Sequence, residues 1–361
     1  MRIIGVDLHA RQQTVAALDT DSGEVMETTL QHSPQDQEEV RSFYAALPRP
    51  ALVGLEASGS MQWFLGLLDE LGVEYSVGHP TEIRKAESRK QKHDRRDAAL
   101  LLRLLRENRF PAIWLPSAEQ RDQRSLLLHR HQLVRMRVGL ENVLQALALN
   151  HGLRLGTALW SVRGQQQLAE LPLAPYTAGR RNQLQALRQK LETQISKLDE
   201  QVQREACRRP LARLLMTHPG VGPVTALASE VFLGDPARFA DGKAVASYVG
   251  MIPSEHSSGG RQRLGRLSKQ GNPFLRFLWV EAARQAVRKD PALQRFYRRK
   301  VAQKGFAKAL VAAARKLGIR LWIMLREQID YQEFCRRGQQ RQSCGAAYAG
   351  MPVKDFGPAT P

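Results

Sequence analysis

The chain has 361 residues and 43% of them are hydrophobic, which allows two or three domains with buried cores and excludes a fully disordered chain. Lysine and arginine number 54 against 35 aspartate and glutamate residues, and the formal net charge of +19 favours a polyanionic partner such as nucleic acid. No apolar run is long enough to span a membrane, and the first residues do not predict a secretory signal. Three scattered cysteines without a CxxC pair argue against a disulfide framework or a zinc site. We therefore expect a cytoplasmic protein.

Residues 1–110 predict an α/β domain. Strand-like apolar segments occupy 2–6, 14–18 and 25–30, with turn residues between the second and the third. A helix over 33–47, a strand over 51–56, a helix over 60–71 and a strand over 73–77 follow. A hairpin start followed by alternating helices and strands predicts a mixed sheet covered on its faces.

Residues 111–209 predict long amphipathic helices. Leucine recurs every seven residues in two series: Leu126, Leu133, Leu140 and Leu147, and then Leu184, Leu191 and Leu198. This spacing favours an antiparallel coiled coil. It leaves open whether the pair is a hairpin within one chain or a dimerisation arm.

Residues 210–328 predict a third, mainly α-helical domain. Its segment 261–316 carries 16 lysine and arginine residues and two acids, Glu281 and Asp290. Residues 329–361 are polar and contain glycine and proline, so we expect a disordered tail.

Carboxylates follow the predicted strands of the first domain. Asp7 ends the first strand and Glu56 ends the strand over 51–56, and functional side chains of α/β sheets gather at the carboxyl ends of strands. Asp94 and Asp97 have the i, i+3 spacing that places two side chains on one helix face. Carboxylates that converge need cations, and Mg²⁺ prefers oxygen ligands. Taken singly, each acid has an alternative role as a turn residue, a capping partner or an N-cap.

Basic residues surround the predicted pair of helix-borne acids. The segment 84–109 contains ten lysine and arginine residues, among them Arg95 and Arg96. A metal site within a basic rim is typical of enzymes that process nucleic acids, because cations attract the phosphates while carboxylates hold the metal.

Asp7, Glu56, Asp94 and Asp97, here called the four acids, resemble in their order the DEDD site of RuvC-like enzymes with the ribonuclease-H fold. The segment 218–283 resembles the transposase domain of the insertion-sequence-110 family, which are DEDD transposases also described as bridge-RNA-guided recombinases. The resemblance extends from Met1 to about Glu327 and rests on GVDLH, GLEASG, HDRRDA, PGVGPVTA, SSGG and KQGNPFLR together.

The resemblance implies a site shared between two domains. The four acids match the Mg²⁺ ligands, and Ser258 matches the serine that attacks a DNA phosphate and forms a covalent phosphoserine link. It also implies a homo-oligomer, because the acid site of one subunit assembles with the serine domain of another. The resemblance further implies a non-coding bridge RNA that pairs with donor and target DNA, and a bacterial or archaeal host.

The serine segment suits phosphate binding. Glycines follow Ser258, and the side chains of Arg261, Arg263, Arg266 and Lys269 can hold phosphate oxygens. Ser257 is the nearest alternative nucleophile, and without the resemblance a basic loop that only touches DNA is the simpler interpretation. Gly220 and Gly222 resemble the turn of a helix-hairpin-helix module, where backbone N–H groups meet phosphate, although they can also serve only the turn.

Other functions fit parts of this pattern. A RuvC-like junction-resolving nuclease would use the four acids without a serine or a covalent intermediate. A non-catalytic nucleic-acid-binding protein would use the charge alone. A sugar-kinase-like or actin-like ATPase also opens with a strand, an aspartate and a hairpin, but it requires a second glycine-rich phosphate loop that the sequence does not contain.

Overall fold

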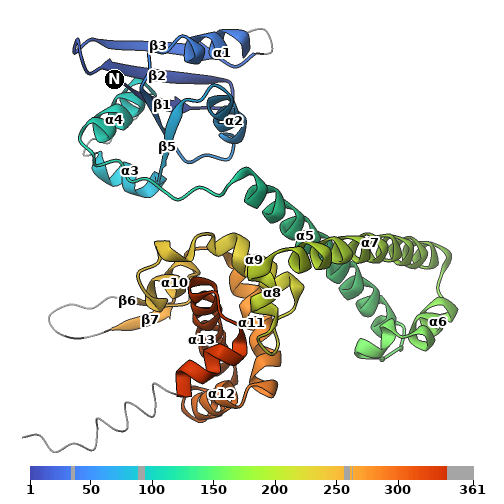
Figure 1. The fold of residues 1–361 in the computed structure, drawn as a ribbon. Helices are drawn as coiled ribbons and strands as arrows, with labels where there is room; N and C mark the ends of the chain where they lie inside the picture. The colour runs from blue at the N-terminus through green and yellow to red at the C-terminus, as the bar shows by residue number, and fades with distance from the viewer. Residues whose placement is uncertain (34–36, 88–93, 256–260, 262, 340–361) are drawn as a thin grey trace, which may run out of the picture. The chain divides into compact units, whose positions relative to one another are not determined.

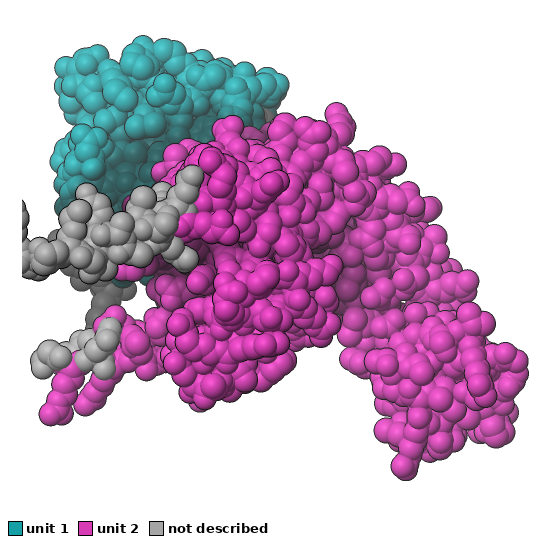
Figure 2. All heavy atoms as spheres, turned by 60° about the horizontal axis from the view of Figure 1, so that its bottom comes forward, with its two compact units in different colours: residues 1–115 teal, residues 116–361 magenta. Residues whose placement is uncertain are grey.

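The computed structural model describes residues 1–33, 37–87, 94–255, 261 and 263–339 (Figure 1). The chain divides into two compact units, residues 1–115 and residues 116–361, which Figure 2 colours separately. Within the described ranges, no helix is both long enough and apolar enough to cross a membrane.

The first unit is built on a five-stranded mixed sheet. Its strands are β1 (Arg2–Leu8), β2 (Gln12–Asp19), β3 (Val25–Gln31), β4 (Ala51–Glu56) and β5 (Glu74–Gly78). Their order is β3-β2-β1-β4-β5. β1 and β2 pair antiparallel, as do β2 and β3, whereas β1 with β4 and β4 with β5 pair parallel. The predicted strands and the predicted α/β class of this domain are confirmed.

Helices cover both faces of this sheet. They are α1 (Gln37–Ala45), α2 (Gln62–Glu70), α3 (Pro80–Ala86) and α4 (Asp94–Arg106). On one face, Ile4 and Val6 of β1 form a core with Tyr44 of α1 and Phe64 of α2. On the other face, Ile3 packs with Ala98 and Leu102 of α4. Burial on both faces explains why β1 reads as a continuous apolar run.

Two long helices run antiparallel in the second unit, α5 (Ala118–Asn150) and α7 (Pro175–Arg208). Ion pairs join Arg130 to Asp199 at 2.5 Å and Arg188 to Glu141 at 3.0 Å, so the residue number rises along one helix as it falls along the other. The short helices η1 (Gly156–Trp160) and α6 (Val162–Glu170) lie between them in the chain. The helical hairpin is therefore seen within one chain, and supercoiling into a coiled coil stays a prediction.

The rest of the second unit is mainly helical, as expected. It comprises α8 (Pro210–Met216), α9 (Pro223–Leu233), η2 (Pro236–Arg238), α10 (Gly242–Tyr248), β6 (Pro253–Glu255), β7 (Leu264–Leu267), α11 (Pro273–Lys289), α12 (Pro291–Lys304) and α13 (Phe306–Glu327). Trp279 of α11 is fully buried and its indole N–H donates to the hydroxyl of Ser229 on α9 at 2.9 Å. β6 and β7 pair as an antiparallel two-stranded sheet.

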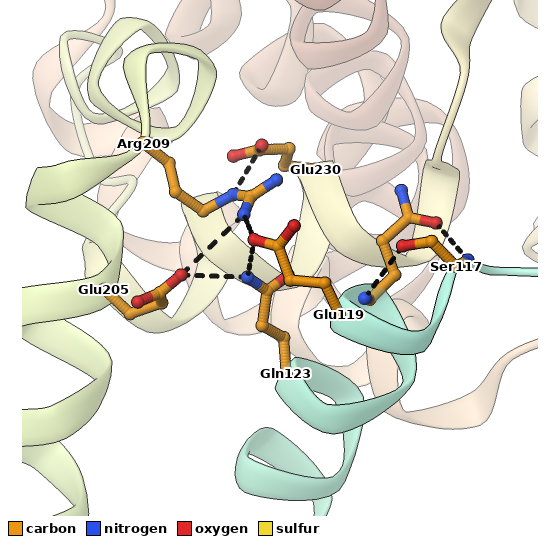
Figure 3. A network of polar contacts seen from close by, with 7 residues as sticks. Ser117, Glu119, Gln123, Glu205, Arg209 and Glu230 are labelled. Carbon is orange, nitrogen blue, oxygen red and sulfur yellow. Dashed lines mark hydrogen bonds and ion pairs between the residues drawn. The ribbon is translucent and has the colours of Figure 1, made fainter.

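A polar network joins the helical hairpin to the C-terminal helices (Figure 3). The guanidinium of Arg209 contacts Glu230 of α9 at 2.7 Å and Glu119 of α5 at 2.6 Å. Gln123 of α5 donates to Glu205 of α7 at 2.8 Å. The expected domains 111–209 and 210–328 therefore lie in one compact unit, because the end of α7 packs against α8 and α9.

The helical part of the chain extends beyond the expected start of the tail at residue 329. Residues 331–339 are helical, and Arg337 pairs with Glu327 at 2.8 Å and with Glu333 at 2.7 Å. The backbone N–H of Tyr331 donates to the hydroxyl of Thr217 at 2.9 Å. These contacts order a segment whose composition alone predicts disorder.

Candidate active site

Two of the four acids end neighbouring parallel strands. Val6 of β1 is paired with Leu55 of β4, and Asp7 and Glu56 each follow by one residue. Both carboxylate residues are partly buried, and the Asp7 side chain is 14% exposed. The register therefore places Asp7 and Glu56 beside each other at the carboxyl edge of the sheet, as the sequence predicted.

Both side chains belong to the sheet face that α4 covers. Side chains alternate along a strand, so Asp7 shares its face with Gly5 and Ile3, and Glu56 shares its face with Gly54. Ile3 packs against α4, and a Cβ on Gly54 would meet the side chain of Leu105 at 2.5 Å. The helix that carries the remaining two acids therefore packs on the same face as Asp7 and Glu56.

A close approach between β1 and α4 depends on Gly5. A Cβ on Gly5 would lie 2.3 Å from the carbonyl oxygen of Ala98 and 2.5 Å from the backbone nitrogen of Leu102. Asp97 directly precedes Ala98, and Gly5 lies two residues, about 6.6 Å, before Asp7 along the strand. The absence of a side chain at Gly5 thus lets the backbone next to Asp97 approach the strand that ends in Asp7.

Asp94 is the first residue of α4, and its side chain lies outside the described part of the chain. Asp97 is partly buried, whereas Arg95 and Arg96 in the first turn of α4 are exposed. The structure therefore brings the backbones of the acid-bearing segments together and places two of the predicted nucleic-acid-binding arginines on the same helical turn as Asp94 and Asp97.

His9 is a residue of this site that the sequence reasoning did not assign. Its Nε2 lies 3.1 Å from Oδ2 of Asp7, and its side chain is 41% exposed. The sequence feature that could have identified His9 is the spacing D-x-H at the end of β1. In extended backbone, side chains two residues apart point to the same face of the strand. A histidine in this position can orient the Asp7 carboxylate.

Carboxylate oxygens are the ligands that Mg²⁺ prefers, so the donor set of the four acids fits this ion. Among the described residues, which omit the Asp94 side chain, no group of three histidine, cysteine, aspartate or glutamate side chains is arranged to hold a metal. Mg²⁺ binding by the four acids accordingly stays a prediction.

The serine segment falls between β6 and β7 in the chain. Ser257 and Ser258 lie outside the described residues, as do the glycines that follow them. The described cationic residues after them, Arg261, Arg263, Arg266 and Lys269, are exposed. Exposed cations beside the predicted nucleophile are compatible with a role in phosphate binding.

The turn between α8 and α9 contains Gly220 and Gly222. Gly220 has φ +86°, and a Cβ there would lie 2.5 Å from the backbone nitrogen of Ala286 on α11. This glycine therefore has a packing role in the C-terminal core. Gly222 is the N-cap of α9, where no side chain caps the helix. Nucleic-acid binding by either glycine stays a prediction.

Two family models match separate ranges of the chain. Residues 4–151 match a family model described as "Transposase" and named for the DEDD transposases of IS110. Residues 212–298 match a model described as "Transposase IS116/IS110/IS902 family". The acid-bearing domain and the serine-bearing domain thus fall within separate matches to transposases.

Relatives that match over most of their length give the same result. The chain is 31% identical to the "Probable family 20 transposase" of Pseudomonas aeruginosa, over 91% of this chain and 98% of that protein. It is 26% identical to the "Transposase for insertion sequence element IS1111A" of Coxiella burnetii, over 92% of each chain. These matches define the class of the protein as a DNA transposase. The chain belongs to the IS110 family of insertion-sequence transposases.

A solved structure also matches part of the chain. Thermus thermophilus RuvC matches with a TM-score of 0.24 and 15% identity, over 31% of this chain and 100% of that chain. The strand order and register of the first unit define its fold.

Proposed function

We propose that this transposase cuts and joins DNA strands at a composite site made of the four acids and Ser258. The observation that carries the proposal is the adjacency of Asp7 and Glu56 on the sheet face covered by α4, the helix of Asp94 and Asp97. The four acids would hold Mg²⁺, which when bound neutralises charge on the phosphate and on the oxygens that attack and leave.

Ser258 is proposed as the nucleophile. Its Oγ attacks the phosphorus of a DNA phosphodiester and loses its proton, while the bond from phosphorus to one sugar oxygen breaks. That oxygen takes up a proton and leaves as a hydroxyl group, and the DNA remains joined to the protein through a phosphoserine ester. Attack by a sugar hydroxyl of another strand reverses these changes and joins the new pair of strands.

Several residues are proposed to position the DNA. Arg261, Arg263, Arg266 and Lys269 are exposed on and beside the strand that follows the serine segment, where guanidinium and ammonium groups can hold phosphate oxygens. Arg95 and Arg96 would act in the same way beside the acids. Attraction by these cations offsets the repulsion between the carboxylates and the DNA.

The proposal extends to the partners. Donor and target DNA are the substrates, a non-coding bridge RNA pairs with both, and subunits assemble so that the acids of one serve the serine of another. This assembly would act on DNA in a bacterial or archaeal cytoplasm. The net charge of +19 suits large polyanionic partners, and the resemblance to the insertion-sequence-110 family supplies the RNA and the oligomer.

Strand cleavage at varied Mg²⁺ concentration tests the role of the acids. Asp7→Asn and Glu56→Gln keep the shape of each side chain but remove its charge, and cleavage should fall by at least about 100-fold in each. Asp69→Asn is a matched control, because Asp69 is an exposed carboxylate near the end of α2 that accepts a hydrogen bond from the hydroxyl of Tyr75. Full cleavage by Asp7→Asn would contradict the proposal, and DNA binding without cleavage in the wild type would favour a passive binder.

A further inference from the structure

The helical C-terminal part of the second unit carries a strongly basic pocket that begins after the serine segment in the chain. It lies between α12, α13 and the helical residues 331–339, has a volume of about 750 Å³ and is lined by six cationic side chains and no acid. These are Arg295, Lys300, Lys304, Arg315, Lys316 and Arg320. None of them belongs to the acid site or to the cations predicted around Ser258.

Five of the six positive charges in this pocket have no ion-pair partner among the described residues. Arg320 pairs with the buried carboxylate of Asp290, but no carboxylate of the described chain lies within ion-pairing distance of the other five. The sequence explains why, since residues 291–326 contain ten lysine and arginine residues and no aspartate or glutamate. Partial burial lowers the pKa of Lys316, and the charges of Arg320 and Arg299 lower it further, whereas the charge of Asp290 raises it.

The floor of the pocket is apolar. Phe296, Ile319 and Ile323 line it, and the ammonium nitrogen of Lys316 lies 4.6 Å from the centroid of the Phe296 ring. Apolar walls lower the local dielectric and strengthen the attraction between the cations and a bound anion. The ring also holds Lys316 in place through a cation–π contact.

The spacing of the cations suits a repeating anion. Lys300 and Lys304 are four residues apart on α12, so their side chains share one face of the helix at about 6 Å along its axis. One strand of B-DNA carries about two phosphates over that axial length. Arg315 and Lys316 of α13 line the same pocket, so a phosphodiester chain can contact more of these cations than a single small anion can.

We infer that the pocket between α12 and α13 is a second nucleic-acid contact, which binds the phosphodiester backbone without reading bases. The inference rests on the proposed function for the identity of its polyanion. DNA and RNA share this phosphodiester backbone, and the binding experiment described next is done with each of them to tell which one the pocket binds. The site adds affinity, and it takes no part in strand cleavage.

The salt dependence of binding tests this inference. The 361-residue chain carries Asp7→Asn, which suppresses strand cleavage, and is titrated with labelled duplex DNA or single-stranded RNA between about 50 and 200 mM salt. Lys300→Gln with Lys304→Gln removes two cations of the pocket. The slope of log K against log salt should become shallower by about 1.8 on duplex DNA, or by about 1.4 if single-stranded RNA is the ligand.

Lys190→Gln with Lys197→Gln is the matched control, since both lysines are exposed on α7 and the double variant loses the same charge. An unchanged slope on both nucleic acids in the pocket variant, or an equal change in the control, would overturn the inference. Lys300→Arg with Lys304→Arg should restore the slope, which separates lost contacts from misfolding. Because this experiment measures binding and not cleavage, its outcome does not depend on whether the four acids bind Mg²⁺ and support catalysis.

Discussion

The imidazole Nε2 of His9, which directly follows β1, lies 3.1 Å from the carboxylate Oδ2 of Asp7 near the end of that strand. Groups that orient a metal ligand typically contribute 10–100-fold to metal affinity or activity. We therefore expect His9→Phe to raise the Mg²⁺ concentration needed for half-maximal strand cleavage about tenfold, with a smaller effect at saturating Mg²⁺. His9→Gln should recover part of the loss. An unchanged Mg²⁺ dependence in His9→Phe would show that His9 does not position Asp7.

Gly5 allows β1 and α4 to approach each other. Gly5→Ala places a Cβ 2.3 Å from the carbonyl oxygen of Ala98, so the helix must move, and we expect a loss of about 1–3 kcal/mol in the free energy of unfolding. Gly139→Ala in α5 is the control, because nothing lies within 4 Å of its new methyl group. It should stabilise the protein slightly, since alanine favours a helix. Urea unfolding of both variants checks the prediction, and equal stability would contradict it.

Arg209 neutralises the negative charge of a buried carboxylate, Glu230. Burial raises the pKa of Glu230, and Arg209 is its ion-pair partner at 2.7 Å. Removing one partner of a buried ion pair costs about 3–5 kcal/mol, and because Arg209 is partly exposed we expect Arg209→Met to cost about 2 kcal/mol at neutral pH. The double variant Arg209→Met with Glu230→Gln should recover most of this loss. Thermal unfolding that shows the double variant to be as unstable as the single one would contradict this role.

The histidine His218 should make stability depend on pH. Its side chain is fully buried, and burial lowers its pKa from 6.5 to about 4. Above pH 6.5 it is neutral in both states. As the pH falls from 6.5 to 4, the unfolded chain binds a proton that folded His218 does not, so folding loses roughly 3 kcal/mol.

His218→Phe isolates this effect, because phenylalanine does not titrate and its ring can pack against Tyr331. The free energy of unfolding of this variant should fall less steeply between pH 6.5 and 4 than that of the wild type. The lowered pKa of Asp290 acts in the same direction but only below about pH 3.8, outside this window. Parallel pH profiles for the two proteins would mean that His218 is accessible to protons when folded.

The placement of Asp7 and Glu56 at one edge of the sheet can be predicted from the sequence because it follows from local rules. Asp7 and Glu56 end apolar strands, and the carboxyl ends of parallel neighbours meet at one edge. Sequence reasoning did not find His9, whose role depends on the side-chain geometry at the strand end. It could not find the contacts of Arg209 either, because Glu119 lies 90 residues away in the chain and only folding brings the two together.

Composition was less informative where long-range contacts decide the structure. Residues 331–339 are mostly polar, yet they form a helix that is stabilised by the ion pairs of Arg337 with Glu327 and Glu333. The expected boundary at residue 209 is not a boundary between compact units, because Val202 and Ala206 of α7 belong to the same core as α9. Such packing depends on residues distant in the sequence.

A covalent-adduct assay tests the central claim most directly. The protein is mixed with Mg²⁺, labelled DNA spanning the junction of the element and RNA transcribed from its flank, and is then denatured. We predict labelled DNA that stays attached to the wild type and to Ser257→Ala but is absent from Ser258→Ala and reduced in Asp7→Asn. Clean cleavage without an adduct, unaffected by Ser258→Ala, would contradict the account and place the whole reaction on the four acids.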